Sequence, residues 1–143
     1  GSMGHASAIA FGVAAKKPSR DVYCIDGDGA CLMHLGNMAA VGSSNLQNYK
    51  HILLNNGVHD SVGAQGTSVS GLDYSQVASA MGYSFTKRVS TVEELNEALP
   101  ELVAVNGPGF VEICIKPGAR SDLGRPTRST IENKEAFMLN LEE

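Results

Sequence analysis

The chain has 143 residues, with 11 Lys plus Arg against 15 Asp plus Glu and a formal net charge of −4. That is the size of one domain, and a hydrophobic content of 43% argues against intrinsic disorder. The acidic balance, with pI ≈ 5.5, argues against a nucleic-acid partner; no apolar run approaches the roughly 18 residues of a membrane span, and no basic leader of a signal peptide is visible.

The predicted elements alternate between helix and strand. In chain order they are a helix over 6–15, a strand over 22–26, a helix over 32–41, a strand over 51–54, a helix over 74–81, a weaker strand over 83–87, a helix over 92–105, a strand over 110–115 and a helix over 131–141. This alternation predicts an α/β fold, an open and mainly parallel sheet with helices on both faces.

Two long loops, 57–72 and 117–130, leave from the expected carboxyl ends of strands. Open parallel sheets bind ligands at those ends, so we expect both loops to be functional. The cysteines, Cys24, Cys31 and Cys114, form no C-x-x-C pair and are odd in number. We expect them to be reduced thiols in a cytoplasmic protein.

The most informative motif is Asp26-Gly27-Asp28-Gly29 at the end of the first predicted strand. The glycines let a ligand approach the backbone, and a helix expected to start near Ala30 would offer free amides to a diphosphate. Because Asp28 faces the same anion, the pair needs a hard divalent cation between them.

The second predicted strand ends in Asn55-Asn56-Gly57, and an Asn amide oxygen is a neutral ligand for such a cation. Each motif alone is weak, because both occur in ordinary turns. Residues 30–54, 25 in number, separate them, which leaves room for one helix and one strand. The spacing therefore predicts that both motifs lie at the same edge of the sheet.

GDG followed after about 25 residues by NN resembles the cofactor motif of thiamine-diphosphate-dependent enzymes, and nearly the whole chain, 1–143, resembles their diphosphate-binding domain. The resemblance implies thiamine diphosphate and Mg²⁺ as cofactors. It implies metal ligands from Asp28, the Asn56 side chain and the Val58 carbonyl. It implies a diphosphate site lined by Gly27, Gly29 and Ala30.

The N-terminal Gly1-Ser2-Met3-Gly4 is similar to the family's segment before the first helix. The resemblance implies that Met3 holds the cofactor in its bent shape and that the Gly1 carbonyl accepts a hydrogen bond from the aminopyrimidine. Gly-Ser-Met is also a common cloning remnant, and the following Gly4-His5-Ala6-Ser7 favours a native origin.

The loop NNGVHDSVGAQGT (55–67) and the tail DLGRPTRSTIENKEAFM (122–138) resemble the phosphonopyruvate decarboxylases, whose near relatives are the sulfopyruvate decarboxylases. Ala64 and Gly66 depart from the family loop, which tends to have Gly and Pro there. The resemblance implies decarboxylation of 3-phosphonopyruvate to phosphonoacetaldehyde and CO₂. Bidentate arginines suit a phosphonate or sulfonate, which makes Arg120, Arg125 and Arg128 candidate substrate ligands, although all three also suit a solvated loop.

His59 is a candidate for proton transfer, or else a loop histidine bonded to backbone. In this family a Glu from a separate pyrimidine-binding domain activates the cofactor, and no acidic residue here matches it. We therefore expect a fragment or subunit that is inactive alone and that self-associates in the complete enzyme. Three alternatives stay open: sulfopyruvate decarboxylation, acetolactate-synthase-like carboligation, and a non-catalytic diphosphate-binding module.

Overall fold

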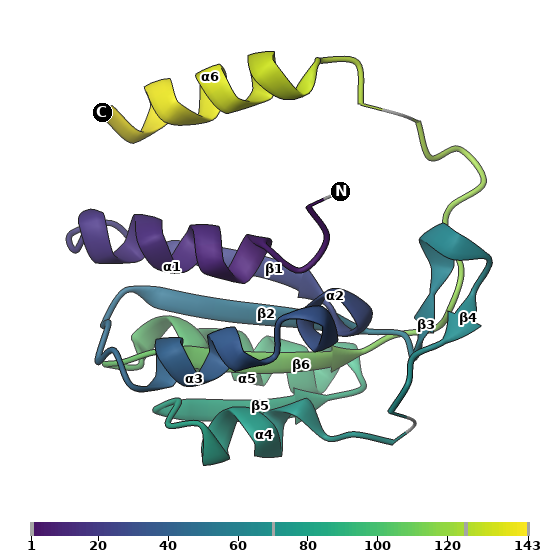
Figure 1. Ribbon diagram of the computed structural model, residues 1–143. Coiled ribbons are helices and arrows are strands. Elements are labelled where there is room, and N and C mark those ends of the chain that lie inside the picture. The colour runs from purple at the N-terminus through teal and green to yellow at the C-terminus, as the bar shows by residue number, and fades with distance from the viewer. Residues whose placement is uncertain (1, 70, 125, 143) are drawn as a thin grey trace.

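A parallel sheet forms the centre of the computed structural model, which describes residues 2–69, 71–124 and 126–142. The sheet has four strands, in spatial order β1 (Val22–Gly27), β2 (Tyr49–Asn55), β6 (Gly109–Cys114) and β5 (Phe85–Val89) (Figure 1). β1, β2 and β6 were predicted from short apolar runs, as expected for strands covered on both faces. The weaker strand predicted over 83–87 is present as β5, two residues further along the chain. The predicted α/β class and parallel sheet are confirmed.

Helices cover both faces of the sheet, in two groups of unequal size. The larger core joins four helices to β1, β2 and β6: α1 (Ala6–Lys16), α2 (Asp28–Met33), α3 (Gly36–Gly42) and α4 (Tyr74–Ala80). The smaller core joins α5 (Val92–Ala104) to β5 and β6. The neighbours Phe110 and Val111 belong to different cores, because successive strand residues point to opposite faces.

The predicted helix over 32–41 is wrong in its bounds, because the segment forms two short helices. The first, α2, begins at Asp28 rather than near Ala30, with Gly27 extended before it. The helix ends where His34 leaves helical geometry (φ −136°, ψ 44°), and α3 begins at Gly36, a poor helix former. Both helices reach the larger core, α2 through Cys31 and α3 through Met38.

The predicted loop over 57–72 contains a small hairpin. β3 (Val58–His59) pairs antiparallel with β4 (Gln65–Gly66), and a 3₁₀ turn, η1 (Asp60–Val62), joins them. The chain reverses through Gly63 and Ala64, both at positive φ (85° and 56°). The hairpin holds the segment after Asn55-Asn56 close to the end of the sheet.

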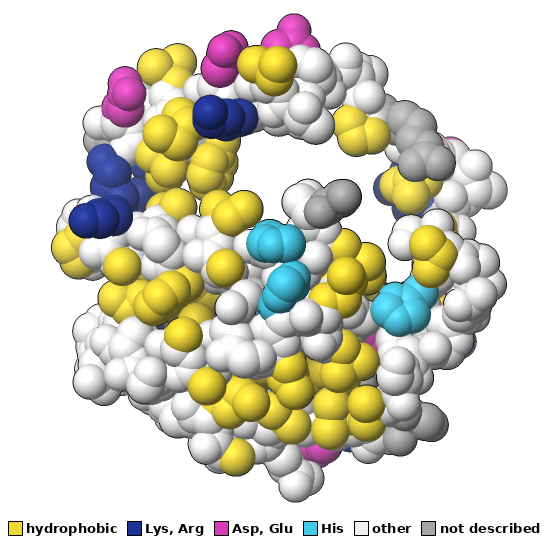
Figure 2. Space-filling view, viewed as in Figure 1, with side chains coloured by type: hydrophobic (Ala, Val, Ile, Leu, Met, Phe, Trp, Pro, Cys, Tyr) yellow, Lys and Arg dark blue, Asp and Glu magenta, His cyan; other side chains and the backbone are white. Residues whose placement is uncertain are grey.

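The predicted tail and closing helix are present, and the helix, α6 (Thr130–Glu142), lies over α1 at the side of the molecule (Figure 1). It has no buried residue. Its attachment includes Arg20, whose guanidinium donates to the Asn140 carbonyl (2.8 Å) and to Asn140 Oδ1 (2.7 Å). Figure 2 shows an open gap between the C-terminal segment and the rest of the molecule. Within the described residues, no helix is long and apolar enough to cross a membrane.

Candidate functional site

The two predicted motifs meet at one edge of the sheet. β1 and β2 are parallel neighbours in a register that places Gly27 opposite Leu54, so each motif follows its strand at the same level. Asp28 is the first residue of α2 and is 3% exposed. Its Oδ2 accepts a hydrogen bond from the Gly57 N–H at 3.1 Å. The carboxylate of the first motif therefore touches the turn that carries the second.

The backbone of Asp28 is fixed from a third element. Tyr74 of α4 is buried, and its hydroxyl donates to the Asp28 carbonyl at 3.3 Å. Burial raises the pKa of the Tyr74 phenol, so the hydroxyl keeps its proton and stays a donor at neutral pH. The Asp28 turn is thus held by α4 as well as by the second motif.

Asn56 is oriented by both ends of its amide group. Its Oδ1 accepts from the Val58 N–H at 3.1 Å, and its Nδ2 donates to Asp60 Oδ2 at 2.7 Å. The same Asp60 oxygen accepts from the Gly118 N–H at 3.0 Å, which ties the start of the C-terminal tail to this turn. The Asn56 amide oxygen, the Asp28 carboxylate and the Val58 carbonyl are hard oxygen donors, the type of ligand that Mg²⁺ prefers.

His59 belongs to β3, and its ring reaches the first turn of α2. A Cβ added at Gly29 would collide with the His59 ring, at Cε1 and Nδ1, so the ring packs directly on the Gly29 backbone. Glycine is the one residue type that permits this contact at position 29, because it has no Cβ. The structure thereby brings His59 together with the Gly27–Ala30 turn.

The N-terminal segment runs beside the same turn. Gly4 has φ +84°, and a Cβ there would lie 2.7 Å from His34 Cδ2 and 2.8 Å from the Ala30 carbonyl oxygen. Its close approach to α2 places Ser2 and Met3, which is 41% exposed, at this side of the molecule. Gly1, the expected aminopyrimidine acceptor, lies outside the described residues.

The two described tail arginines, Arg120 and Arg128, make their contacts within the C-terminal segment. Arg120 makes a local bidentate pair with Asp122, with Nε–Oδ1 at 2.9 Å and Nη2–Oδ2 at 2.8 Å. Arg128 lines a hollow with Glu132 and Glu135 of α6. Arg125 lies outside the described residues. Among the described residues, no hydrogen bond joins Arg120 or Arg128 to the Asp28 turn.

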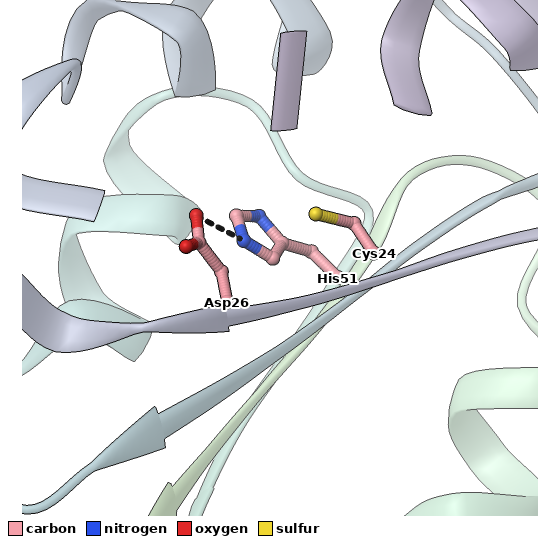
Figure 3. A group of neighbouring side chains, drawn as sticks. All are labelled: Cys24, Asp26 and His51. Carbon is pink, nitrogen blue, oxygen red and sulfur yellow. Dashed lines mark ion pairs between the residues drawn. The ribbon is translucent and has the colours of Figure 1, made fainter. Parts of the chain in front are cut away.

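A buried polar cluster next to Gly27 was not predicted from the sequence. Cys24, Asp26 and His51 bring ligand atoms within 4.8 Å of one another (Figure 3). Asp26 Oδ1 accepts from the Gly27 N–H at 3.0 Å, and its Oδ2 lies 3.6 Å from His51 Nε2. His51 Nδ1 lies 3.3 Å from the Tyr83 hydroxyl. With the hydroxyl donating to Nδ1 and Nε2–H facing the carboxylate, the cluster forms a polar chain that ends on the Gly27 backbone.

The cluster was hidden because Cys24 and His51 stand inside apolar runs, which predict only buried strands. Burial raises the pKa of the Cys24 thiol to about 11, so in the chain as described this thiol is protonated at neutral pH. The pairing of Cys24 with His51 follows from the β1–β2 register, in which these two residues are partners. Only the strand pairing could have revealed it.

The chain is similar in sequence to a known family and to known proteins. Residues 1–113 match the family model described as thiamine pyrophosphate enzyme, C-terminal TPP binding domain. The chain is 41% identical over 137 residues to a phosphonopyruvate decarboxylase of Streptomyces viridochromogenes, covering 96% of this chain but 34% of that protein. It is 34% identical over 118 residues to the sulfopyruvate decarboxylase subunit beta of Methanothermobacter thermautotrophicus, covering 82% and 60%.

Among solved structures, the fold is similar to a thiamine diphosphate-dependent 4-hydroxybenzoylformate decarboxylase of Rhodococcus jostii. The TM-score is 0.69 at 19% identity, covering 81% of this chain and 24% of that one. The chain thus spans about a third of the phosphonopyruvate decarboxylase that it matches. With its sequence matched over residues 1–113 and its fold shared with such enzymes, the chain belongs to the thiamine pyrophosphate enzymes, in the family of their C-terminal TPP-binding domain.

Proposed function

We propose that the chain is the diphosphate- and Mg²⁺-binding part of a thiamine-dependent decarboxylase that converts 3-phosphonopyruvate to phosphonoacetaldehyde and CO₂. The observation that carries this proposal is the 3.1 Å hydrogen bond from Gly57 N–H to Asp28 Oδ2, which joins the two cofactor motifs. The 41% identity to a phosphonopyruvate decarboxylase over nearly the whole chain supports the choice of substrate.

In this proposal Asp28, the Asn56 amide oxygen and the Val58 carbonyl hold Mg²⁺. The cofactor's diphosphate lies along Gly27, Gly29 and Ala30. When bound, thiamine diphosphate supplies the electron sink that a departing carboxylate requires. The chain's own task is to hold that group by its charged end and to orient it.

Two further side chains have proposed roles at the same end of the sheet. Met3 supports the bent cofactor, from a segment that Gly4 packs against α2. His59 stays the candidate for proton transfer, because its ring already faces the Gly29 backbone where the diphosphate would lie. A transferring group has to stand within hydrogen-bond reach of the bound molecules.

A second domain completes the proposed site. The chain spans 34% of the matched phosphonopyruvate decarboxylase and 60% of a relative whose name calls it a subunit. No acidic residue of this chain matches the Glu that the family places in its pyrimidine-binding domain. We infer that this chain alone is inactive, that a pyrimidine-binding domain or subunit restores turnover, and that the complete enzyme is a homo-oligomer.

The substrate's tetrahedral anion is assigned to the tail arginines. Arg120 would first have to release Asp122, so of the two described arginines Arg128 is the better candidate. Sulfopyruvate is the second candidate substrate, favoured by the 34% identity to the sulfopyruvate decarboxylase subunit beta. A sulfonate and a phosphonate share tetrahedral geometry and differ in charge, so the same arginines serve both.

The test is a competition assay on the chain combined with its pyrimidine-binding partner, in thiamine diphosphate and Mg²⁺. Equal amounts of 3-phosphonopyruvate and 3-sulfopyruvate are offered, and the two aldehydes are separated. The proposal predicts mainly phosphonoacetaldehyde and no turnover by the chain alone. A preference for the sulfonate, carboligation products, or turnover without a partner contradicts it.

A further inference from the structure

Glu112 is a buried charge that the proposed site does not yet explain. It lies near the carboxyl end of β6, a central strand, and its exposed fraction is 0%. A buried carboxylate is costly unless hydrogen bonds and an opposite charge compensate it. Its partners therefore indicate what it does.

Both carboxylate oxygens of Glu112 are used. Oε1 accepts from Asn55 Nδ2 at 2.7 Å, and Oε2 accepts from the Ser75 N–H near the start of α4 at 3.2 Å. Arg88, the register partner of Glu112 on β5, approaches Oε1 with Nε at 3.5 Å and supplies the compensating charge. The carboxylate thus joins β5, β6 and α4 to the last residue of β2.

Asn55 belongs to the second cofactor motif and connects Glu112 to Gly57 in that motif. While its Nδ2 donates to Glu112, its Oδ1 accepts from the Gly57 N–H at 3.1 Å. The same N–H also donates to Asp28 Oδ2 at 3.1 Å. Glu112 fixes which end of the Asn55 amide faces the turn, because a carboxylate accepts and does not donate.

We propose that Glu112 is a positioning residue for the Mg²⁺-binding turn and that it acts through Asn55. This inference rests on the proposed function, since it assigns the turn to Mg²⁺. Residues that orient metal ligands by hydrogen bonds without touching the metal typically weaken metal binding by about 10- to 100-fold when they are removed. Glu112 also reaches α4, whose Tyr74 holds the Asp28 carbonyl, so both halves of the site share one anchor.

The test is Mg²⁺ titration by calorimetry, at saturating thiamine diphosphate, on the complete natural protein with its pyrimidine-binding partner. In Glu112→Gln, the new NH₂ group faces either the Asn55 NH₂ group or the Ser75 N–H, depending on how the amide is oriented. Each of these is also a donor, so one of the two hydrogen bonds is lost. The double variant N55D/E112Q exchanges donor and acceptor and restores the hydrogen bond. Glu101→Gln is the matched control, since it removes a surface charge paired with Lys87 at 3.2 Å.

We expect Glu112→Gln to weaken Mg²⁺ binding by about tenfold or more, the double variant to recover to within about threefold, and Glu101→Gln to leave the affinity unchanged. A merely structural role would not return the affinity when the hydrogen bond is reversed. Thermal unfolding of the metal-free proteins identifies a variant that does not fold. If Glu112→Gln does not fold, the double variant is the test, because the inference then requires it to fold and to bind Mg²⁺ as the parent protein does.

Two results overturn the inference: an unchanged affinity in Glu112→Gln, or a double variant that folds and binds no better than the single one. Failure of the parent protein to bind Mg²⁺ with thiamine diphosphate is a different result. It contradicts the proposed function itself, and the two failures are therefore distinguishable.

Discussion

The Asp28 carboxylate is almost fully buried, and the hydrogen bond that it accepts from the Gly57 N–H leaves most of its acceptor capacity free. A buried carboxylate with free lone pairs is suited to a divalent cation, and the proposed site adds an Asn amide oxygen and a backbone carbonyl. Loss of this charge should therefore remove the metal rather than disturb the fold.

Asp28→Ala is predicted to abolish Mg²⁺-dependent binding of thiamine diphosphate, measured by calorimetry with and without Mg²⁺. Asp60→Asn is the control, because Asp60 contacts Asn56 from the exposed side of the turn. It should bind less tightly by a few-fold but still require Mg²⁺. Unchanged affinity in Asp28→Ala contradicts the assigned role.

The thiols of Cys24 and Cys31 set how stability responds to pH in the mildly alkaline range, before the tyrosines ionise. Burial raises their pKa values to about 11 and about 12, above the roughly 8.5 of a free thiol. As pH rises past that lower value, the unfolded chain releases these protons first. Folding stability therefore falls with rising pH, by up to about 1.4 kcal/mol per pH unit for each thiol.

Urea unfolding in reducing buffer between pH 7 and 9 measures this slope mostly below the range in which the tyrosines of the unfolded chain ionise, near pH 10. Replacing Cys24 and Cys31 by Ala should flatten the slope, whatever it does to the absolute stability. Replacing the half-buried Cys114 by Ser should leave the slope as it is. A slope equally steep without the two buried thiols argues against this assignment.

At the residue level, the sequence predicted what depends on motif and spacing. Asp28 meets Gly57 of the second motif because 25 residues separate the two motifs in a parallel sheet. The contact of His59 with Gly29 depends on the path of the hairpin, which no local pattern specifies. Arg120 pairs with Asp122 two residues away, a choice that its type and position do not reveal.

Between elements, a close backbone approach joins α3 to the end of α4. A Cβ at Gly42 would collide with the Met81 carbonyl oxygen, which is backbone and cannot swing aside. Gly36 lies in the same helix, and a Cβ there would meet nothing within 4 Å. The same Gly→Ala change can therefore be compared at a crowded and at an open position of one helix.

Gly42→Ala is predicted to destabilise the fold by about 1–3 kcal/mol, the usual cost of overpacking. Gly36→Ala should be neutral or slightly stabilising, because Ala is the better helix former. Thermal or urea unfolding of the two variants gives the comparison. Equal stabilities would show that α3 and α4 do not approach as closely as described.

Element type was predictable where one local signal dominates, and element bounds were not. The capping box of α5, with Thr91 accepting from the Glu94 N–H and Glu94 reaching back, is such a signal. The break between α2 and α3 has none, because it depends on how Cys31 and Met38 each reach the core. The β3–β4 hairpin is only two residues long on each side, too short for a periodic pattern.

For the whole molecule, α6 contributes little to the stability of the described fold. None of its residues is buried, and Arg20 holds it through Asn140. Removing residues 130–142 should therefore lower the melting temperature by only a few degrees, the effect of about 1 kcal/mol. Arg20→Ala should reproduce most of that change. A drop of more than about 10 °C would show that α6 is part of the core.

The arrangement of Asp28 and Asn56 around one cation is the centre of the account, and Mn²⁺ in place of Mg²⁺ locates it directly. The measurement is the anomalous scattering of Mn²⁺ in crystals grown with thiamine diphosphate. We expect a peak in coordination contact with the Asp28 carboxylate, the Asn56 amide oxygen and the Val58 carbonyl. A peak elsewhere in the molecule, or cofactor bound at this turn without the metal, contradicts it.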